Sequence, residues 1–206
     1  MTEVHWLDWA QRLAAIAQSG LAYCQNPFDI ERYEQIRVLA AEMVAHNSDA
    51  DLSRVQGLLD EQVGYATPKV DVRGAVFRGD EILLVKELSD GGWTLPGGWA
   101  DVNEPPSQAA EREVREESGY EVRAVRLMGV YDRNQHGFPR YFFHIYKLVI
   151  ECELIGGEAK TSIETGGAAF FAENALPTLS VQRTTPELLA RLFDQHRRGA
   201  REAEFD

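Results

Sequence analysis

Residues 98–120 of this chain read GWADVNEPPSQAAEREVREESGY, and charged residues recur in this stretch at fixed gaps. Two prolines open residues 105–118, and residues that favour helices follow them. Gly119 supplies a stop, because glycine tolerates the left-handed conformation that often ends a helix. This stretch therefore predicts a helix with a sharply defined beginning and end.

Three glutamates on this helix predict a metal site. Glu113, Glu116 and Glu117 are spaced i, i+3, i+4, so their carboxylates project from one face. Gathered like charges repel one another unless a cation lies between them, and Mg²⁺ suits carboxylate and phosphate oxygens. Arg112 precedes Glu116 by four residues and is placed to hold it, and the Gly97 carbonyl is a candidate further ligand. We expect Mg²⁺ or Mn²⁺ here rather than a merely solvated acidic face.

The spacing matches a longer pattern, G-x5-E-x7-R-E-U-x-E-E-x-G-U, in which U is apolar or aromatic. Gly98, Glu104, Arg112 and Gly119 all stand in register with the three glutamates. In this the chain resembles the Nudix hydrolases, enzymes that cleave a nucleoside diphosphate linked to another moiety. The resemblance implies the α/β class, with a mixed sheet in an α/β/α sandwich. It also implies that Glu104 and Arg112 hold loop and helix together.

The character of the chain changes once. Residues 1–66 show helical spacing throughout, and Thr67-Pro68 marks a boundary, after which strand patterns begin, including one over residues 141–154. We therefore expect a small all-α domain at 1–66 and a Nudix hydrolase domain at 67–206. The phrases TPKVDVRG, WTLPGGWAD and LPTLSVQRT resemble a bacterial subgroup with such a helical domain, similar to CDP-choline, ADP-ribose and UDP-linked pyrophosphatases. That resemblance implies a homodimer to which the helical domain contributes.

The implied reaction is attack of water on one phosphorus of a P–O–P bridge. Metal held by the three glutamates neutralises the diphosphate oxygens and lowers the pKa of a bound water. The proton acceptor is Glu116, Glu117 or Glu164, the last of which lies in a loop before a predicted strand. Members of the superfamily often use such a loop glutamate, and Glu158 is its competitor.

Candidate substrate-binding residues lie outside the glutamate pattern. Arg133 and Arg140 flank His136 in a predicted loop, where arginines are suited to diphosphate oxygens and the histidine either contacts substrate or is inert. Arg73, on a predicted hairpin, is a similar candidate. Trp99 either stacks on a base or fills core.

Composition excludes several other classes of function. The net charge of −12 argues against a nucleic-acid binder, and residues 1–66 carry only four Lys and Arg against ten Asp and Glu, so we expect no DNA partner. The substrate is expected to be a small nucleotide. Two cysteines, no basic leader and no long apolar run predict a cytoplasmic protein that does not span a membrane.

Three rival functions remain open. A MutT-like nucleoside triphosphate pyrophosphohydrolase shares the glutamate pattern but usually lacks a helical domain. A non-catalytic Nudix ligand sensor is expected to have a degraded pattern, and here the pattern is intact. An isopentenyl-diphosphate isomerase needs a reactive cysteine, whereas Cys152 stands at a strand end without an obvious partner.

Overall fold

The computed structural model describes residues 5–206, and these fall into two compact units. The first comprises the chain up to Pro68 together with Arg140–His144, and the second comprises Lys69–Pro139 and Ile145–Asp206. The helices of the first unit are α1 (Trp6–Tyr23), α2 (Pro27–His46) and α3 (Leu52–Asp60). The second unit contains β1 (Lys69–Arg78), β2 (Glu81–Glu87), β3 (Trp93–Thr94), β4 (Gly97–Trp99), α4 (Pro106–Ser118), β5 (Tyr120–Asp132), η1 (Arg133–Gln135), β6 (Ile145–Gly157), β7 (Thr165–Ala172), η2 (Glu173–Ala175), α5 (Pro186–Arg198) and β8 (Glu204–Phe205).

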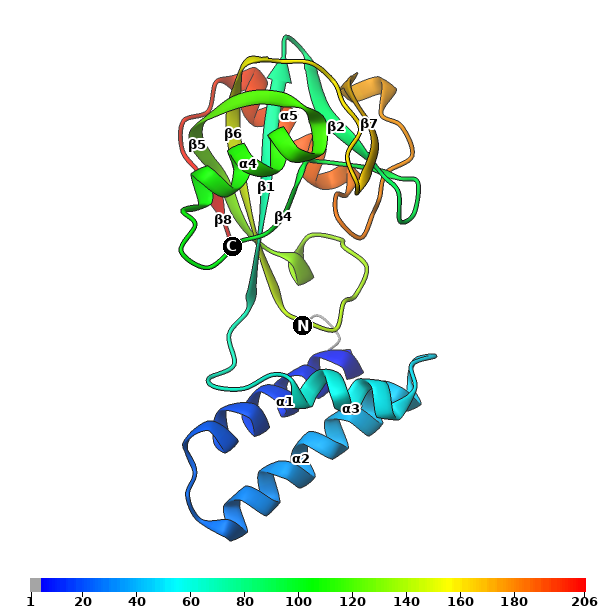
Figure 1. The fold of residues 1–206 in the computed structure, drawn as a ribbon, viewed down its shortest axis with the longest axis vertical. Helices are drawn as coiled ribbons and strands as arrows, with labels where there is room; N and C mark the ends of the chain where they lie inside the picture. The colour runs from blue at the N-terminus through cyan, green and yellow to red at the C-terminus, as the bar shows by residue number, and fades with distance from the viewer. Residues whose placement is uncertain (1–4) are drawn as a thin grey trace. The chain divides into compact units, whose positions relative to one another are not determined.

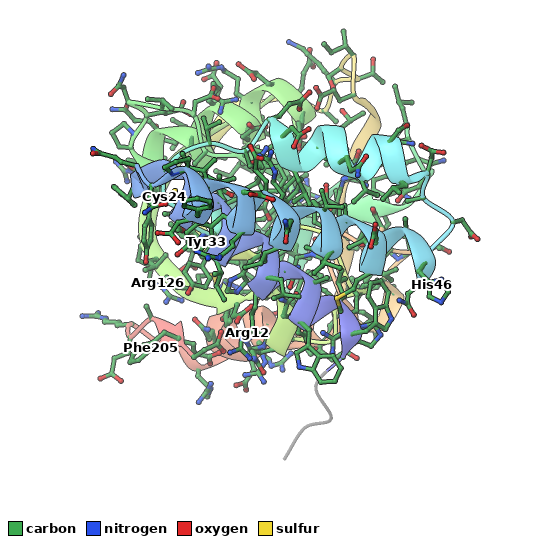
Figure 2. The ribbon with its side chains drawn as sticks, turned by 90° about the horizontal axis from the view of Figure 1, so that it is seen from below. Arg12, Cys24, Tyr33, His46, Arg126 and Phe205 are labelled. Carbon is green, nitrogen blue, oxygen red and sulfur yellow. The ribbon has the colours of Figure 1, made fainter. Side chains whose placement is uncertain are left out.

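Side-chain caps begin each helix of the first unit. Asn26 and Asp51 accept backbone N–H groups at the starts of α2 and α3, which satisfies donors that a helix leaves unpaired. The three helices enclose a small core to which Ala10, Ala41 and Val55 each contribute one buried side chain. Gly20 on α1 lets α2 approach closely, because a Cβ there would lie 2.4 Å from the ring of Tyr33, which is labelled in Figure 2. The helical character predicted for the first part of the chain is confirmed.

A mixed sheet forms the centre of the second unit, with strand order β3-β2-β1-β6-β5-β8. Strands β1 and β6 are parallel, whereas β5 and β6 are antiparallel. The short strand β4 pairs with β1, and β7 pairs with β2. The mixed sheet flanked by helices confirms the predicted fold class.

Alternation along β1 directs side chains to two separate cores. Val72 and Val76 point to the α4 side, where Val114 lies, and Ala75 points to the α5 side, where Leu189 lies. Figure 1 shows α4 and α5 covering opposite faces of the sheet. All five of these side chains are fully buried, so both α4 and α5 are packed against the sheet.

The strand predicted from residue 141 begins later than expected. Strand β6 starts at Ile145, and Arg140–His144 belong to the helical unit. Gln11 explains the difference, because its side-chain amide donates to the carbonyls of Tyr141 and Phe142, both at 2.9 Å. Apolar residues in this segment therefore serve the helical core rather than the sheet. Within residues 5–206, the structure has no helix long and apolar enough to cross a membrane.

Candidate active site

Helix α4 is attached to the loop before it by a forked ion pair. Arg112 donates to both carboxylate oxygens of Glu104, each at 2.9 Å. At the other end, Gly119 adopts the left-handed conformation with φ of 78° and its N–H donates to the Arg115 carbonyl. The bracing role expected of Glu104 and Arg112, and the stop at Gly119, are confirmed.

Arg112 also contacts two of the three predicted metal ligands. Its guanidinium donates to Glu113 at 2.8 Å and to Glu116 at 3.2 Å. Burial raises the pKa of Glu113, and Arg112 opposes that rise. Glu116 is the more exposed of the two carboxylates. Arg112 thus holds both side chains on the same side of α4.

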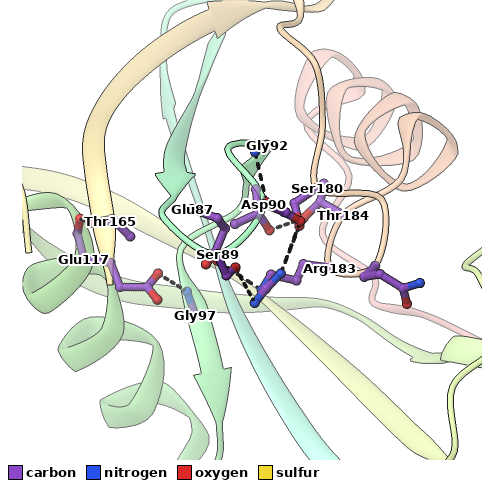
Figure 3. Close-up of polar contacts among 12 residues, drawn as sticks. Glu87, Ser89, Asp90, Gly92, Gly97, Glu117, Thr165, Ser180, Arg183 and Thr184 are labelled. Carbon is purple, nitrogen blue, oxygen red and sulfur yellow. Dashed lines mark hydrogen bonds and ion pairs between the residues drawn. The ribbon is translucent and has the colours of Figure 1, made fainter. Parts of the chain in front are cut away.

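Glu117 lies deeper than its neighbours on the helix. Its carboxylate accepts a hydrogen bond from the backbone N–H of Gly97 at 2.8 Å (Figure 3). Burial raises the pKa of Glu117 to about 7, although the charge of Arg73 and the Gly97 hydrogen bond both act to lower it. Thr165 fixes the backbone here, because its hydroxyl donates to the Glu117 carbonyl at 2.6 Å. Glu117 is therefore a largely desolvated carboxylate in a fixed position.

Strand β4 lies between β1 and the glutamates, and at Gly97 it has no room for a side chain. Gly97 has φ of 143°, and a Cβ on it would lie 2.1 Å from the Val72 carbonyl oxygen. A Cβ on Gly98 would lie 3.2 Å from Glu113 Oε1. The two glycines thus allow the backbone to approach both carboxylates closely.

The carboxylate oxygens of Glu113, Glu116 and Glu117 are of the kind that a hard divalent cation prefers. They lie in a crowded, partly desolvated setting, where a cation would relieve their mutual repulsion. Within residues 5–206, however, no three His, Cys, Asp or Glu side chains are arranged as a ready-made metal cluster. Arg112 accounts for this, because it engages Glu113 and Glu116 while Glu117 engages Gly97. The metal-ligand assignments of Gly97, Glu113, Glu116 and Glu117 remain predictions.

A group of buried charges lies on the neighbouring strands β1 and β6. Arg73 donates through Nε and Nη2 to Asp71, at 3.1 and 2.9 Å, and through Nη1 to the Leu95 carbonyl at 3.0 Å. Lys147 on β6 also pairs with Asp71. Burial lowers the pKa of Lys147 to about 8, while Asp71 opposes that change. Burial acts to raise the pKa of Asp71, but the two cations outweigh it and lower it. The positive charge of Arg73 also acts on Glu117.

Of the other predicted substrate residues, Arg133 adjoins these buried charges, because its charge acts on Lys147. Arg133 is buried in η1 and donates to the side chain and carbonyl of Gln182, at 2.7 and 3.2 Å. His136 bonds Asp206 at 2.6 Å, and Trp99 is half exposed at the end of β4. Arg140 belongs to the helical unit, where it pairs with Asp8. Their substrate-binding roles, like that of Arg73, remain predictions.

Backbone hydrogen bonds fix the position of Glu164 in its loop. Its backbone N–H donates to the Ser162 hydroxyl at 3.1 Å, and its carbonyl accepts from Leu88 N–H at 3.0 Å. The residue after it, Thr165, is the one bonded to the Glu117 carbonyl. The backbone of Glu164 therefore lies one residue from a direct link to Glu117, whereas its role as base is still a prediction.

Sequence reasoning missed two charged residues, Glu87 and Arg183, beside the charges of Arg73 and Glu117. Glu87 ends β2 with a buried side chain, and its carboxylate pairs with Arg183 at 3.1 Å. The one signal available was a charge that follows the apolar run ILLV, because a glutamate at an inward position of a buried strand requires a partner. Nothing in the sequence pointed to Arg183 as that partner, ninety-six positions further along the chain.

Two family models match this chain, and between them they extend over most of it. Residues 4–59 match a model described as a UDP-X-like, N-terminal oligomerisation domain, and residues 67–192 match the NUDIX domain. The Bacillus subtilis protein YjhB, whose name carries a provisional assignment as an ADP-ribose pyrophosphatase, is 45% identical over 204 residues, 99% of this chain and 98% of that protein.

Solved structures agree with these matches. A crystal structure of a UDP-X diphosphatase is 34% identical with a TM-score of 0.63, and the alignment covers 98% of each chain. An ADP-ribose pyrophosphatase from Streptococcus suis is 39% identical with a TM-score of 0.61, covering 68% of this chain and 100% of that one. The chain belongs to the Nudix hydrolase family, as its glutamate pattern predicted. Enzymes of this family generally use divalent metals.

Proposed function

We propose that this protein hydrolyses the diphosphate bridge of nucleoside diphosphates linked to a second moiety, in a reaction that depends on Mg²⁺ or Mn²⁺. The products are a nucleoside monophosphate and a phosphorylated second moiety, for example CMP and phosphocholine. The observation that carries the proposal is the desolvated Glu117 carboxylate, held by Gly97 beside Glu113. Relatives named for ADP-ribose and UDP-X hydrolysis support substrates of that type, and CDP-choline is the third candidate.

Glu113, Glu116 and Glu117 are the residues that would hold the divalent ion. When bound, such an ion neutralises diphosphate oxygens and lowers the pKa of water. The chain supplies the positioning: Arg112 orients Glu113 and Glu116, and the Gly97 amide orients Glu117. A carboxylate accepts the proton of the attacking water, and Glu116, Glu117 and Glu164 are the candidates.

We also infer that the protein is a homodimer formed through its helical unit. The match to an oligomerisation domain supports this, as do the large apolar side chains that the unit leaves exposed. Trp9, Phe28 and Leu39 are each more than half exposed. Light scattering after size exclusion tests the inference: we expect a mass of twice the chain for the wild type and a monomer for Leu39→Lys. A wild-type monomer at micromolar concentration would contradict it.

The substrate class is tested by product analysis on CDP-choline, ADP-ribose, UDP-sugars and nucleoside triphosphates, with Mg²⁺ or Mn²⁺. Formation of a monophosphate from a linked diphosphate supports the proposal and identifies the preferred substrate. Release of pyrophosphate from triphosphates alone would assign the protein to the MutT-like alternative. Metal binding without turnover of any compound would indicate a ligand sensor.

A further inference from the structure

The end of strand β2 pairs with the residue that anchors the C-terminal end of α4. Pairing between β2 and β7 shifts register between Val85 and Glu87, and Glu87 comes to lie opposite Thr165. Thr165 is the residue whose hydroxyl donates to the Glu117 carbonyl. The irregularity therefore places Glu87 across one strand pair from the residue that anchors Glu117.

Arg183 holds the Glu87 carboxylate in this position. Its Nε lies 3.1 Å from Glu87 Oε1, and its other nitrogens contact the hydroxyls of Ser180 at 3.1 Å and Ser89 at 3.2 Å. Asp90 lies 3.5 Å from the same guanidinium. With four partners on one guanidinium, Arg183 has little freedom to move, and Glu87 shares its fixed geometry.

The flanking residues fix the segment that carries Arg183. The Thr184 hydroxyl accepts from Leu95 N–H at 3.1 Å and shares a hydrogen bond with the Thr94 hydroxyl at 2.8 Å. Gln182, on the other side, accepts from the buried Arg133. Three consecutive residues thus attach this segment to three parts of the unit, which makes Arg183 a rigid support.

The Glu87 side chain faces the same group of charges as Glu117. It is only 9% exposed, and the charges of Arg73 and Glu164 act on it. The charge of Glu87 in turn acts on Glu117. In the view of Figure 3, Glu87 lies between Glu117 and Arg183. Arg73 acts on both carboxylates, so all three belong to one electrostatic group.

We propose that Glu87, positioned by Arg183, is a further functional carboxylate of this site, which accepts hydrogen bonds from water on the divalent ion rather than touching the ion itself. Mg²⁺ retains several waters when carboxylates bind it, and those waters need acceptors in a protected site. Carboxylates that orient ligands from outside the first layer of contacts change metal affinity by about 10- to 100-fold. The inference rests on the proposed function, because it takes Glu113, Glu116 and Glu117 as the holders of the ion.

A Mn²⁺ titration followed by electron paramagnetic resonance tests this role without turnover. We expect Glu87→Gln to weaken Mn²⁺ binding by about 10-fold, and Glu87→Asp to recover part of the loss because it keeps the charge. Arg183→Lys keeps the positive charge but cannot contact all four partners of the guanidinium, so we expect a smaller loss of Mn²⁺ affinity than in Glu87→Gln. Arg126→Gln is the matched control, because Arg126 forms a largely buried ion pair with Glu151 and contacts Gln195 on α5, which covers the face of the sheet opposite α4. It should bind Mn²⁺ as the wild type does.

Thermal unfolding without metal separates this role from a structural one. Glu87→Gln should retain the wild-type midpoint, since glutamine keeps the shape and the hydrogen bond to Arg183. Wild-type Mn²⁺ affinity in Glu87→Gln would overturn the inference, as would an affinity loss that Glu87→Asp does not relieve. If the wild type hydrolyses substrate and Glu87→Gln has unchanged Mn²⁺ affinity, the proposed function stands and only the role of Glu87 is ruled out. If Glu87→Gln binds Mn²⁺ more weakly but the wild type hydrolyses no substrate, the role of Glu87 in metal binding stands and the proposed hydrolysis is ruled out.

Discussion

The carboxylate of Glu117 accepts a hydrogen bond from the Gly97 amide at 2.8 Å, across the junction between helix α4 and strand β4. This bond connects Glu117 to the residue just before the glutamate pattern, twenty positions earlier in the chain. It holds a carboxylate away from water on a backbone that only glycine permits. The geometry of the whole site depends on this close approach.

Substitution of Gly97 by alanine should therefore be severe. A Cβ would lie 2.1 Å from the Val72 carbonyl, and φ of 143° is unfavourable for any residue with a side chain. We expect the free energy of unfolding to fall by about 2 kcal/mol or more, measured by urea denaturation.

Gly57→Ala is the matched control for that substitution. Gly57 lies within α3, and a Cβ there meets nothing within 4 Å. The protein should gain up to about 1 kcal/mol, because alanine favours helix. Equal losses in both variants would show that Gly97 has no special constraint.

The stability of the metal-free protein should depend on pH through Glu117. Its pKa in the folded protein is about 7, above the ordinary value of 4.5, so the folded state retains a proton that the unfolded chain has released. The corresponding stability is fully present below about pH 4.5 and is lost as pH rises through 7. Urea denaturation in EDTA should show this decline in the wild type, and Glu117→Gln should reduce it.

Divalent metal should reverse the same decline. Binding to the ionised carboxylates stabilises the folded state by mass action, so Mg²⁺ should raise the unfolding midpoint more at pH 8 than at pH 5. Calorimetry across this range checks the expectation. An increase that is independent of pH, or one that persists in Glu117→Gln, would place the ion elsewhere.

Arg112→Lys should weaken both the fold and the site. Lysine keeps the charge but cannot form the forked pair with Glu104 while also contacting Glu113. We expect a loss of about 1 kcal/mol in the free energy of unfolding, with a lower kcat. Arg123→Lys, which alters an exposed pair with Glu153, should change neither quantity measurably. Equal effects of the two variants would contradict the bracing role.

Glu164 and Glu158 should differ in their effect on catalysis. If Glu164 is the base, Glu164→Gln lowers kcat by about 100-fold while KM changes little. Glu158→Gln is the comparison, because Glu158 is the alternative candidate, whereas Glu164 adjoins Thr165, whose hydroxyl donates to the Glu117 carbonyl. A larger loss in Glu158→Gln would exchange the two assignments.

Local regularities made much of this molecule predictable from its sequence. The helix of the glutamate pattern ends at Ser118 and is capped by Gly119, because prolines and glycine set both limits within a few residues. The contact between Glu104 and Arg112 followed from the family pattern. The segment Tyr141–Phe143 was misread as strand, because aromatic residues favour strands locally and the competing hydrogen bonds come from Gln11.

Long-range pairing explains what the sequence did not reveal. Glu87 and Arg183 are single charges in unrelated stretches, and only the β2–β7 pairing and the Thr94–Thr184 contact bring them together. The pairing of Arg140 with Asp8 in the helical unit was likewise not indicated by its neighbours in sequence, and its substrate-binding role stays a prediction. Sequence spacing carries little information about such contacts.

The most direct test compares the wild type with Glu117→Gln under single-turnover conditions, with excess enzyme, Mg²⁺ and ADP-ribose or CDP-choline. The account predicts that the wild type forms a nucleoside monophosphate in equal amount to the phosphorylated second product. It also predicts that Glu117→Gln, though folded, is slower by about 100-fold or more. Turnover at the wild-type rate by Glu117→Gln would contradict the central role of this carboxylate.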